Sequence, residues 1–358
     1  MQRRTFLQFA TASALATLSH RTFAAASREE DRPWRTFELT YQVDLSGQTG
    51  AGRLWLPLPH EAGEYQRVLS THWDAGTAQA SLQVEPQYRA PILTASWAAD
   101  AVPRALRLTT RVATRDRSRH ATDVHDPREV QDYLQPTRHM PTDGIVAETA
   151  ARITQHAATP DQKARAIYDW IVDNTFRDPA VRGCGMGNIK AMLETGNLGG
   201  KCADINSLFV GLCRAAGVPA REMYGVRVAE SAQLACLGKS GDVSKAQHCR
   251  AEYFSPVHGW VPVDPADVRK AVLEAKLEIT NPKIVALRER LFGYWEMNWV
   301  GFNTARDFEL TPPANAPLPY LMYPYAEFEN RSLDGRDPGR FNFTLHSTEI
   351  FDKPASAA

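Results

Sequence analysis

The sequence predicts an α+β protein in which a β-rich N-terminal domain precedes a core of helices and antiparallel strands. Two observations support this fold class. Up to about residue 115, apolar and polar residues alternate with the period of two that is typical of strands, and from about residue 140 the apolar residues recur with a helical period. Without an N-terminal leader about 330 residues remain, more than one hydrophobic core usually serves, so we expect at least two packed units.

The first residues have the features of an export signal. Arg3 and Arg4 precede a mildly apolar stretch, and three alanines at 24–26 offer a small-residue cleavage site. The paired arginines resemble a bacterial twin-arginine signal; the alternative is a cytosolic protein with a basic N-terminus. We expect residues 1–26 to be a signal peptide and the mature protein to be periplasmic or secreted. No later segment reaches the roughly 20 apolar residues that a membrane span requires.

Composition argues against several classes of partner. Removing residues 1–26 takes away three arginines and no acidic residue, so 41 basic and 41 acidic residues become 38 and 41. This balance, without any basic run, argues against a nucleic-acid partner. The five cysteines are an odd number, so at least one thiol should be free or paired with another molecule in an oxidising compartment. There is no C-x-x-C motif and no His/Cys cluster with zinc-ligand spacing, so we predict no metal and no cofactor.

Residues 27–115 are predicted to form the β-rich domain, a small sandwich. The stretch "RTFELTYQVDL" alternates throughout, and two later stretches, "RLWLPLP" and "RALRLTTRVATR", repeat the pattern. Each is bounded by Gly or Pro. The charged stretch "TRDRSRHATDVHDPRE" then breaks the alternation, so we place a linker at residues 116–139.

The helical part begins with a clear start signal. Thr159 has the properties of an N-cap, Pro160 stands at the first helical position, and Gln162 follows three residues after the cap. The apolar residues of this helix form one stripe, made of Ala164, Ile167, Tyr168, Ile171 and Val172. Glycines at 183, 185 and 187 follow in a loop-like segment. They could form a phosphate cradle, but no strand precedes them and no Gly-Lys-Ser/Thr follows, which favours a plain flexible loop.

The stretch "GGKCADINSLFVGLCRAAGVPAR" predicts a helix that starts near Cys202. Its apolar residues have helical spacing, Gly217 ends the run, and Cys213 lies inside the apolar stripe as a core residue. Cys202 precedes the stripe, in the first turn. A cysteine attacks as a thiolate, and the unpaired N–H groups of a helix N-terminus favour that anion. Cys202 is therefore a candidate nucleophile, although a packing role is the common one for a cysteine at such a position.

A predicted hairpin supplies a candidate base. Between His248 and Asp264 the sequence alternates on both sides of one turn signal, "SPVHG". A turn centred at residue 256 would pair His248 with Asp264 as cross-strand neighbours, so that the carboxylate orients the imidazole. Alternatively, Asp264 is only the N-cap of the helix that starts at Pro265, and His248 is a hydrogen-bonded strand histidine. A nucleophile, a base and an orienting acid on these elements form the arrangement of cysteine acyl transfer.

Three motifs, "GGKCADINSLFVGLCRAAGVPAR", "HCRAEYF" and "GWVPVDPAD", together resemble the transglutaminase-like superfamily. The resemblance implies a papain-like core over residues 140–275, in which a Cys-bearing helix packs on an antiparallel sheet. It also implies a triad of Cys202 as nucleophile, His248 as base and acid, and Asp264 orienting His248. The chain departs from the family pattern at Arg250, where many members have Trp. Arg250 shares a strand face with His248, where it could meet an acidic group or lie at the surface.

The predicted activity is acyl transfer from an amide or peptide bond through a thioester, with hydrolysis favoured over protein crosslinking. Peptides, proteins and cell-wall amides are the accessible substrates. The alternative function is a catalytically idle periplasmic binding or scaffold protein on the same fold, with the β-rich domain or the aromatic residues of an extension at 276–358 as its ligand site. The sequence leaves the pairing of Cys184, Cys213, Cys236 and Cys249 open. Strand alternation turns the Cys249 side chain away from the His248 face, which predicts a structural role.

Overall fold

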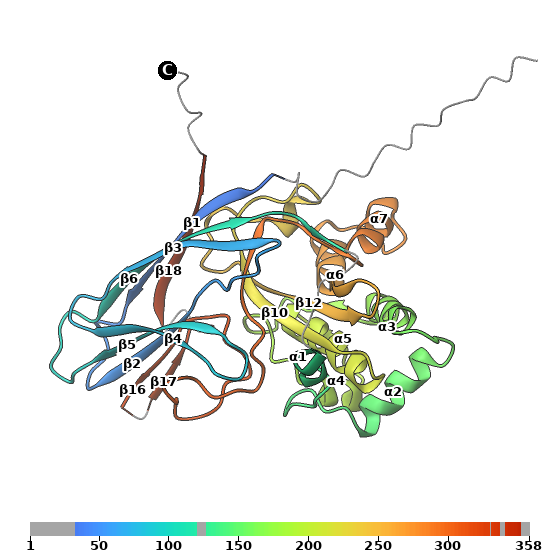
Figure 1. Ribbon diagram of the computed structural model, residues 1–358, viewed down its shortest axis with the longest axis horizontal. Coiled ribbons are helices and arrows are strands. Elements are labelled where there is room, and N and C mark those ends of the chain that lie inside the picture. The colour runs from blue at the N-terminus through green and yellow to red at the C-terminus, as the bar shows by residue number, and fades with distance from the viewer. Residues whose placement is uncertain (1–32, 120–126, 330, 337–340, 352–358) are drawn as a thin grey trace, which may run out of the picture. The chain divides into compact units, whose positions relative to one another are not determined.

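The computed structural model describes residues 33–119, 127–329, 331–336 and 341–351 (Figure 1). The predicted signal peptide, residues 1–26, and the middle of the predicted linker, residues 120–126, lie outside the described residues. Within the described ranges no helix combines the length and the apolar character that crossing a membrane demands.

Two five-stranded antiparallel sheets form the β-rich part of the molecule. The first has the order β11(Gly241–Asp242), β18(Asn342–Ile350), β1(Arg35–Asp44), β6(Ala105–Thr114) and β3(Gln66–Asp74). The second has the order β17(Arg331–Asp334), β16(Tyr325–Phe328), β2(Gly52–Pro57), β5(Pro91–Trp97) and β4(Gln79–Val84). Apolar side chains from both sheets pack in one cluster, which is the predicted sandwich-like arrangement.

The alternation of the sequence explains which side chains fill this cluster. In β1 the residues Phe37, Leu39, Tyr41 and Val43 are all buried, and those between them are more exposed. Successive side chains of a strand point to opposite faces, so this one period-two stretch gives β1 an inner and an outer face.

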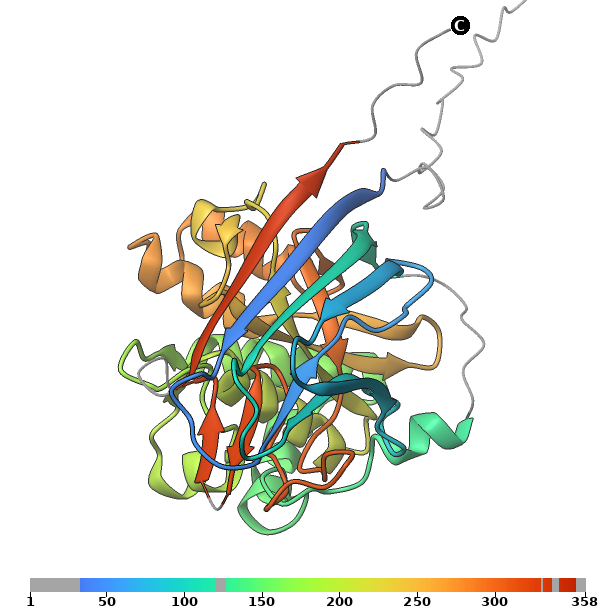
Figure 2. The same cartoon turned by 90° about the vertical axis from the view of Figure 1, so that its left-hand side faces the viewer.

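The last strands of the chain complete the sheets that the first strands begin. β18 pairs with β1 along its whole length, from Thr36 opposite Ile350 to Asp44 opposite Asn342. Figure 2 shows these two strands side by side, β18 in red and β1 in blue. β16 pairs in the same antiparallel way with β2. The segment predicted as an extension, residues 276–358, thus supplies strands to both sheets of the sandwich.

The second part of the molecule is a four-stranded antiparallel sheet covered by helices. The sheet has the order β13(Gly259–Val263), β12(Gln247–Ser255), β10(Ala220–Arg227) and β15(Trp299–Asn303). Its helices are α1(Pro127–Asp132), α2(Gly144–Thr154), α3(Pro160–Asn174), α4(Ile189–Thr195), α5(Cys202–Ala215), α6(Pro265–Glu274) and α7(Pro282–Arg290). Short elements connect them: β7(Arg117–Ser118), β8(Phe176–Arg177), β9(Gly199–Gly200), η2(Ala235–Leu237) and β14(Tyr294–Trp295). This architecture confirms the predicted α+β class.

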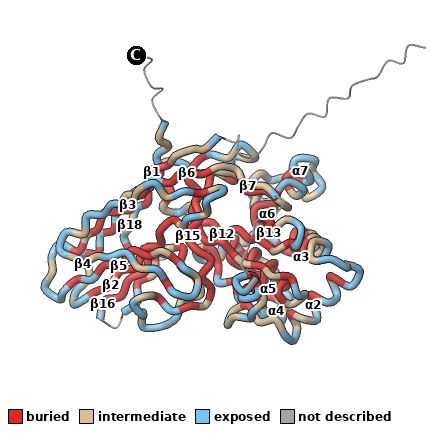
Figure 3. Tube along the Cα trace, in the orientation of Figure 1, coloured by how far each residue is buried: buried red, intermediate tan, exposed pale blue. Residues whose placement is uncertain are grey.

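Helix α5 is the centre of this part. It contacts β12 and β10 of the sheet and also α2, α3, α4 and α6, so every residue from Cys202 to Arg214 is buried (Figure 3). The sequence predicted an amphipathic helix, but the polar residues of α5 are buried too and form hydrogen bonds. Ser207 donates to Glu222, and Arg214 donates to the backbone carbonyl oxygen of Ala220. A buried helix of this kind can hold the groups at its N-terminus rigidly.

Helix α3 starts as its sequence predicts. The Thr159 hydroxyl accepts from the backbone N–H of Gln162, and the Gln162 side chain accepts from the backbone N–H of Thr159. The five residues of its predicted stripe are fully buried against the helical core. The sandwich core also reaches into the four-stranded sheet, because Val226 of β10 and Val300 and Phe302 of β15 pack in the same cluster as β1 and β6.

Candidate active site

Cys202 is the first residue of α5, and a neighbouring acid fixes the backbone around it. The Asp204 carboxylate accepts from three backbone N–H groups, those of Lys201 at 3.0 Å and of Met186 and Gly187 at 2.9 Å. These bonds tie the start of α5 to the glycine-rich loop before it. This loop was predicted to be flexible, but its hydrogen bonds to Asp204 hold it against the start of α5, beside the site.

Glycine is required in this loop for a steric reason. Gly185 has a φ of +92°, and a Cβ atom there would lie 1.9 Å from the Oδ2 atom of Asp204. Both the backbone conformation and the lack of space exclude a side chain. Gly185 thus lets the loop approach the Asp204 carboxylate.

Cys202 and His248 line one cavity of about 670 Å³. Both residues are 3% exposed, so the thiol and the imidazole are buried in the wall of this cavity. As the first residue of a helix, Cys202 has a backbone N–H that no carbonyl of α5 can accept from. Among the described residues it has no hydrogen-bond acceptor elsewhere. This N–H is available to a negatively charged oxygen beside the thiol.

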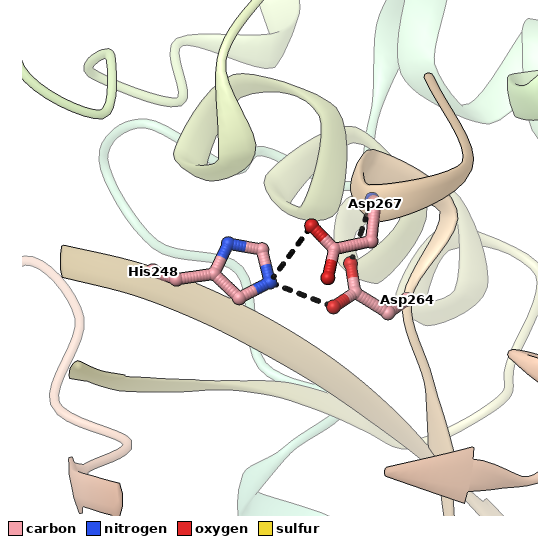
Figure 4. Close-up of side chains that lie close together, drawn as sticks. All are labelled: His248, Asp264 and Asp267. Atoms are coloured by element: carbon pink, nitrogen blue, oxygen red, sulfur yellow. Dashed lines mark hydrogen bonds and ion pairs between the residues drawn. The ribbon is translucent and has the colours of Figure 1, made fainter. Parts of the chain in front are cut away.

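His248, on β12, faces two carboxylates (Figure 4). Its Nε2 atom lies 2.7 Å from Oδ2 of Asp264 and 3.4 Å from Oδ1 of Asp267. Asp264 is a predicted site residue, whereas Asp267 was not predicted. The signal was present, because Asp267 follows Asp264 by three residues in the first turn of α6 and residues at that spacing share a helix face.

The hairpin brings His248 and Asp264 together by a different route from the predicted one. Strand β12 pairs with β13 from Ala251 opposite Val263 to Ser255 opposite Gly259, which puts the turn centre at residue 257 and not 256. His248 therefore has no partner residue on β13, and the expected cross-strand pair is wrong by two residues. Asp264 reaches the imidazole because the chain leaves the sheet after Val263 and turns into α6.

Asp264 has both roles that the sequence offered as alternatives. Its Oδ1 atom accepts the backbone N–H of Asp267 at 3.1 Å and so caps α6, while its Oδ2 atom faces His248. Asn206 of α5 adds a longer contact to Oδ1 at 3.5 Å and donates to the backbone oxygen of Cys249 at 2.8 Å. One carboxylate thus couples the start of α6 to the orientation of the imidazole.

The surroundings shift the pKa values of the thiol and the imidazole in opposite directions. Burial alone would raise the pKa of Cys202. Hydrogen bonds with Cys184, Cys249 and His248, and the charge of His248, outweigh burial and take this pKa well below its usual value. Burial and the Arg227 guanidinium tend to lower the pKa of His248, but the carboxylates of Asp267 and Asp264 outweigh them and raise it. Both shifts favour a thiolate beside an imidazolium.

Two further thiols adjoin Cys202. Hydrogen bonding to Cys202 and burial raise the pKa of Cys184 well above its usual value, and burial followed by the same kind of contact raises that of Cys249. Cys249 is fully buried and packs in the helical core with Ala251 and Tyr253, the alternate residues of β12, as strand alternation predicted. This face also brings it to Cys202. All five cysteines are free thiols, which meets the expectation of at least one.

Arg250 is buried and not at the surface. It is 4% exposed, its guanidinium carbon lies 4.8 Å from the ring centre of Trp299, and its Nε atom lies 3.7 Å from Oδ2 of Asp264. It also donates to the backbone oxygen of Glu296 at 2.9 Å. Arg250 therefore meets the acidic group that its strand face predicted, and it adds positive charge behind the orienting carboxylate.

His248, Asp264 and Asp267 also have the donor types of a cation site, and their ligand atoms lie within 4.8 Å of one another. The charges around them do not fit that role. Arg227 is bound to Asp267 at 2.6 Å, and Arg250 approaches Asp264. The positive charge that a metal ion would provide is already supplied by two guanidinium groups.

Comparison with known proteins shows the family of the region that contains this site. Residues 147–265 match the family model described as the transglutaminase-like superfamily. A relative from Haemophilus influenzae, named only as an uncharacterized protein, is 39% identical over 363 residues, which cover 95% of this chain and 98% of the relative. Residues 147–265 of the chain belong to the transglutaminase-like superfamily.

A solved structure shows the same fold. A protein from Cytophaga hutchinsonii, whose description as a cysteine protease is provisional, is 14% identical with a TM-score of 0.56, covering 90% of this chain and 93% of that one. The periplasmic domain of TgpA from Pseudomonas aeruginosa is 17% identical with a TM-score of 0.36, covering 70% and 92%. The likeness to the Cytophaga hutchinsonii structure and the family model over residues 147–265 confirm the predicted papain-like, transglutaminase-like fold.

Proposed function

We propose that this protein is an exported cysteine-dependent enzyme that transfers acyl groups from amide or peptide bonds, with Cys202 as nucleophile, His248 as base and acid, and Asp264 as the group that orients His248. The observation that carries the proposal is the 2.7 Å contact between Nε2 of His248 and Oδ2 of Asp264, beside a thiol at a helix N-terminus in the same cavity. The family membership of the chain supports this reaction class.

The roles follow from the chemistry of each group. Nε2 of His248 is engaged by the carboxylates, so Nδ1 is the nitrogen left for the thiol. The Cys202 thiolate attacks the carbonyl carbon of the amide, and the backbone N–H of Cys202 stabilises the oxyanion that forms. Imidazolium then gives its proton to the departing amine as the C–N bond breaks, which leaves a thioester on Cys202.

Hydrolysis is the favoured second half of the reaction. Neutral imidazole takes a proton from water, the hydroxide adds to the thioester carbon, and the carboxylic acid leaves as the thiolate returns. Water needs no dedicated binding pocket, whereas a crosslinking enzyme must hold a second amine. The proposed substrates are peptide, protein or cell-wall amides, and the proposed location follows from the twin-arginine pattern in residues 1–26.

The decisive test is the reactivity of the thiol. Mature protein is alkylated with iodoacetamide over a range of pH, and mass spectrometry locates the label in wild type and in His248→Ala. We expect Cys202 to react fast well below pH 8, since its pKa is lowered, and His248→Ala to remove that reactivity. Cys202 reactivity like that of an ordinary thiol, in folded protein, would overturn the proposal.

The alternative function, an idle binding protein, predicts a different result. Under that hypothesis Cys202→Ala leaves ligand binding and cellular phenotype unchanged. Under the proposed function, Cys202→Ala still binds the substrate but releases no amine from it. Amine release by the wild-type protein, measured against this variant, separates the two functions.

A further inference from the structure

The cavity at Cys202 is strongly basic although the chain as a whole is balanced. Seven lysine and arginine residues line it, against two acidic ones, Asp242 and Glu274. Two of the seven are paired with acids outside the lining: Arg227 with Asp267, and Arg336 with Asp334. Even with these partners counted, seven basic groups face four acidic ones. The excess of three is local, because the chain has 41 residues of each sign.

Three lysines without an ion pair contribute most of this excess, and the rest arises because Arg177 and Lys270 share one acid, Glu274. Lys201, Lys239 and Lys245 line the cavity, and in the described part of the chain none of them forms an ion pair. They come from three separate segments, namely the residue before Cys202, the end of η2 and the loop after β11. Lys239 and Lys245 are exposed and Lys201 is partly buried, so their ammonium groups can reach a ligand. Like charges gathered from separate segments around one hollow raise the local concentration of an oppositely charged ligand.

Gln247 adds a second and independent observation. It precedes His248 on β12, lines the same cavity and is 7% exposed. Neither its Nε2 nor its Oε1 atom has a hydrogen-bond partner among the described residues. A buried carboxamide without partners is costly, and it is satisfied by a ligand that offers one donor and one acceptor. The backbone of an extended peptide offers both.

From these two observations we propose that the cavity binds a carboxylate-bearing peptide as the acyl donor, with the carboxylate among Lys201, Lys239 and Lys245 and a peptide group on Gln247. This inference rests on the proposed function and deepens it by naming the substrate class. The carboxylate can be an acidic side chain or a free C-terminus. Lysines suit this task because a flexible ammonium group serves as a point charge for either source.

The experiment uses four matched fluorogenic peptide amides with the full-length mature protein. Two differ only in Glu against Gln near the cleaved amide, and two differ only in a free against an amidated C-terminus. We expect kcat/KM to be about tenfold higher for the anionic member of the pair whose carboxylate the site binds, because a few partly exposed charge contacts act together. Salt should reduce this preference, because exposed charges are screened.

Variants assign the preference to the named residues. Lys239→Gln/Lys245→Gln should reduce the anionic preference, the ratio of kcat/KM for the two members of a pair, about threefold or more. Lys283→Gln is the matched control, because Lys283 is an exposed lysine on α7 outside the cavity lining. Gln247→Leu should raise KM for both members of a pair by the same factor, since it removes the peptide contact and no charge.

The outcomes separate this inference from the function on which it rests. If peptides are cleaved and the charged and neutral members react equally, the substrate class is wrong and the acyl-transfer function stands. If no peptide is cleaved, calorimetric titration of Cys202→Ala with the same peptides decides the inference without chemistry. Equal affinity for charged and neutral peptides, or an effect of Lys283→Gln as large as that of the double variant, would refute it.

Discussion

Replacing Asp264 with Asn tests the centre of the site with the smallest change in shape. The two carboxylate oxygens have different partners: Oδ2 faces Nε2 of His248, and Oδ1 accepts the N–H that starts α6. A carboxamide has only one acceptor oxygen. If that oxygen keeps the helix cap, the amide NH₂ faces His248, so Nε2 must accept and the ring proton moves to Nδ1. The nitrogen needed by the thiol is then protonated in the neutral ring.

The magnitude follows from the distance and the burial of this contact. The 2.7 Å hydrogen bond joins a charged pair in which Asp264 is 1% exposed. Hydrogen bonds to charged groups contribute about 1.5–3 kcal/mol, which corresponds to a fall of about 10- to 150-fold in kcat/KM. Asp267 lies 3.4 Å from the same nitrogen, and its carboxylate still places negative charge beside His248 in the variant. We therefore do not expect activity to be lost completely. Stability should change little, because Asn caps helices about as well as Asp.

The assay is the pH dependence of Cys202 alkylation, with amide hydrolysis beside it. In the wild-type protein the thiolate–imidazolium pair exists above the lowered pKa of Cys202 and below the raised pKa of His248. Loss of the Asp264 charge lowers the pKa of His248 and raises the pKa of Cys202. The pH range in which the thiolate–imidazolium pair exists therefore narrows from both ends. The midpoint of the alkylation profile should move to higher pH. Asp143→Asn, an exposed acid at the start of α2, is the control. An unchanged profile in a folded Asp264→Asn protein would refute the reasoning.

Two other substitutions test the frame around the site. Gly185→Ala forces a Cβ into contact with Asp204 at a φ of +92°. We expect the free energy of unfolding, measured in urea, to fall by about 1–3 kcal/mol and the alkylation of Cys202 to become slower. Gly47→Ala is the control, because a Cβ there meets open space, and it should change neither quantity. Glu252→Gln leaves Arg117 and Arg221 without their buried carboxylate and should cost about 3–5 kcal/mol at pH 7. Burial raises the pKa of Glu252, but both arginines lower it further, to about 2. The stabilisation is present above the unfolded value and is lost as pH falls towards 2, so the difference from wild type must shrink in urea titrations below pH 4. Equal differences at pH 7 and pH 3 contradict this account.

The features that the sequence predicted well are local ones. The capping box at Thr159, the start of α5 at Cys202 and the alternation of β1 depend on neighbours within a few positions, and the structure has all three. The period of the apolar residues gave the class of each part for the same reason. Local rules did not give the register of the hairpin, because a shift of the turn centre by one residue moves every opposed pair by two.

The remaining differences depend on contacts between distant segments. The pairing of β18 with β1 joins residues about 300 positions apart, and no local pattern marks that partner. Arg250 is buried because Trp299, from a strand added later in the chain, covers it. Cys249 lies beside Cys202 because β12 packs against α5, and simple alternation along one strand does not include that packing. In each case the surroundings of a residue come from segments that its own sequence neighbourhood does not contain.

The charges inside the site explain why the lysines around it matter. When Cys202 is a thiolate, it forms with the carboxylates of Asp264 and Asp267 three negative charges. The imidazolium and the guanidinium groups of Arg227 and Arg250 supply three positive ones, as the contacts at 2.6, 2.7 and 3.7 Å indicate. A balanced interior is what burial requires, since an unpaired buried charge is costly. The buried charges around His248 therefore balance without the lysines of the cavity lining. In the proposed complex, the carboxylate of the substrate is the counter-charge of these lysines.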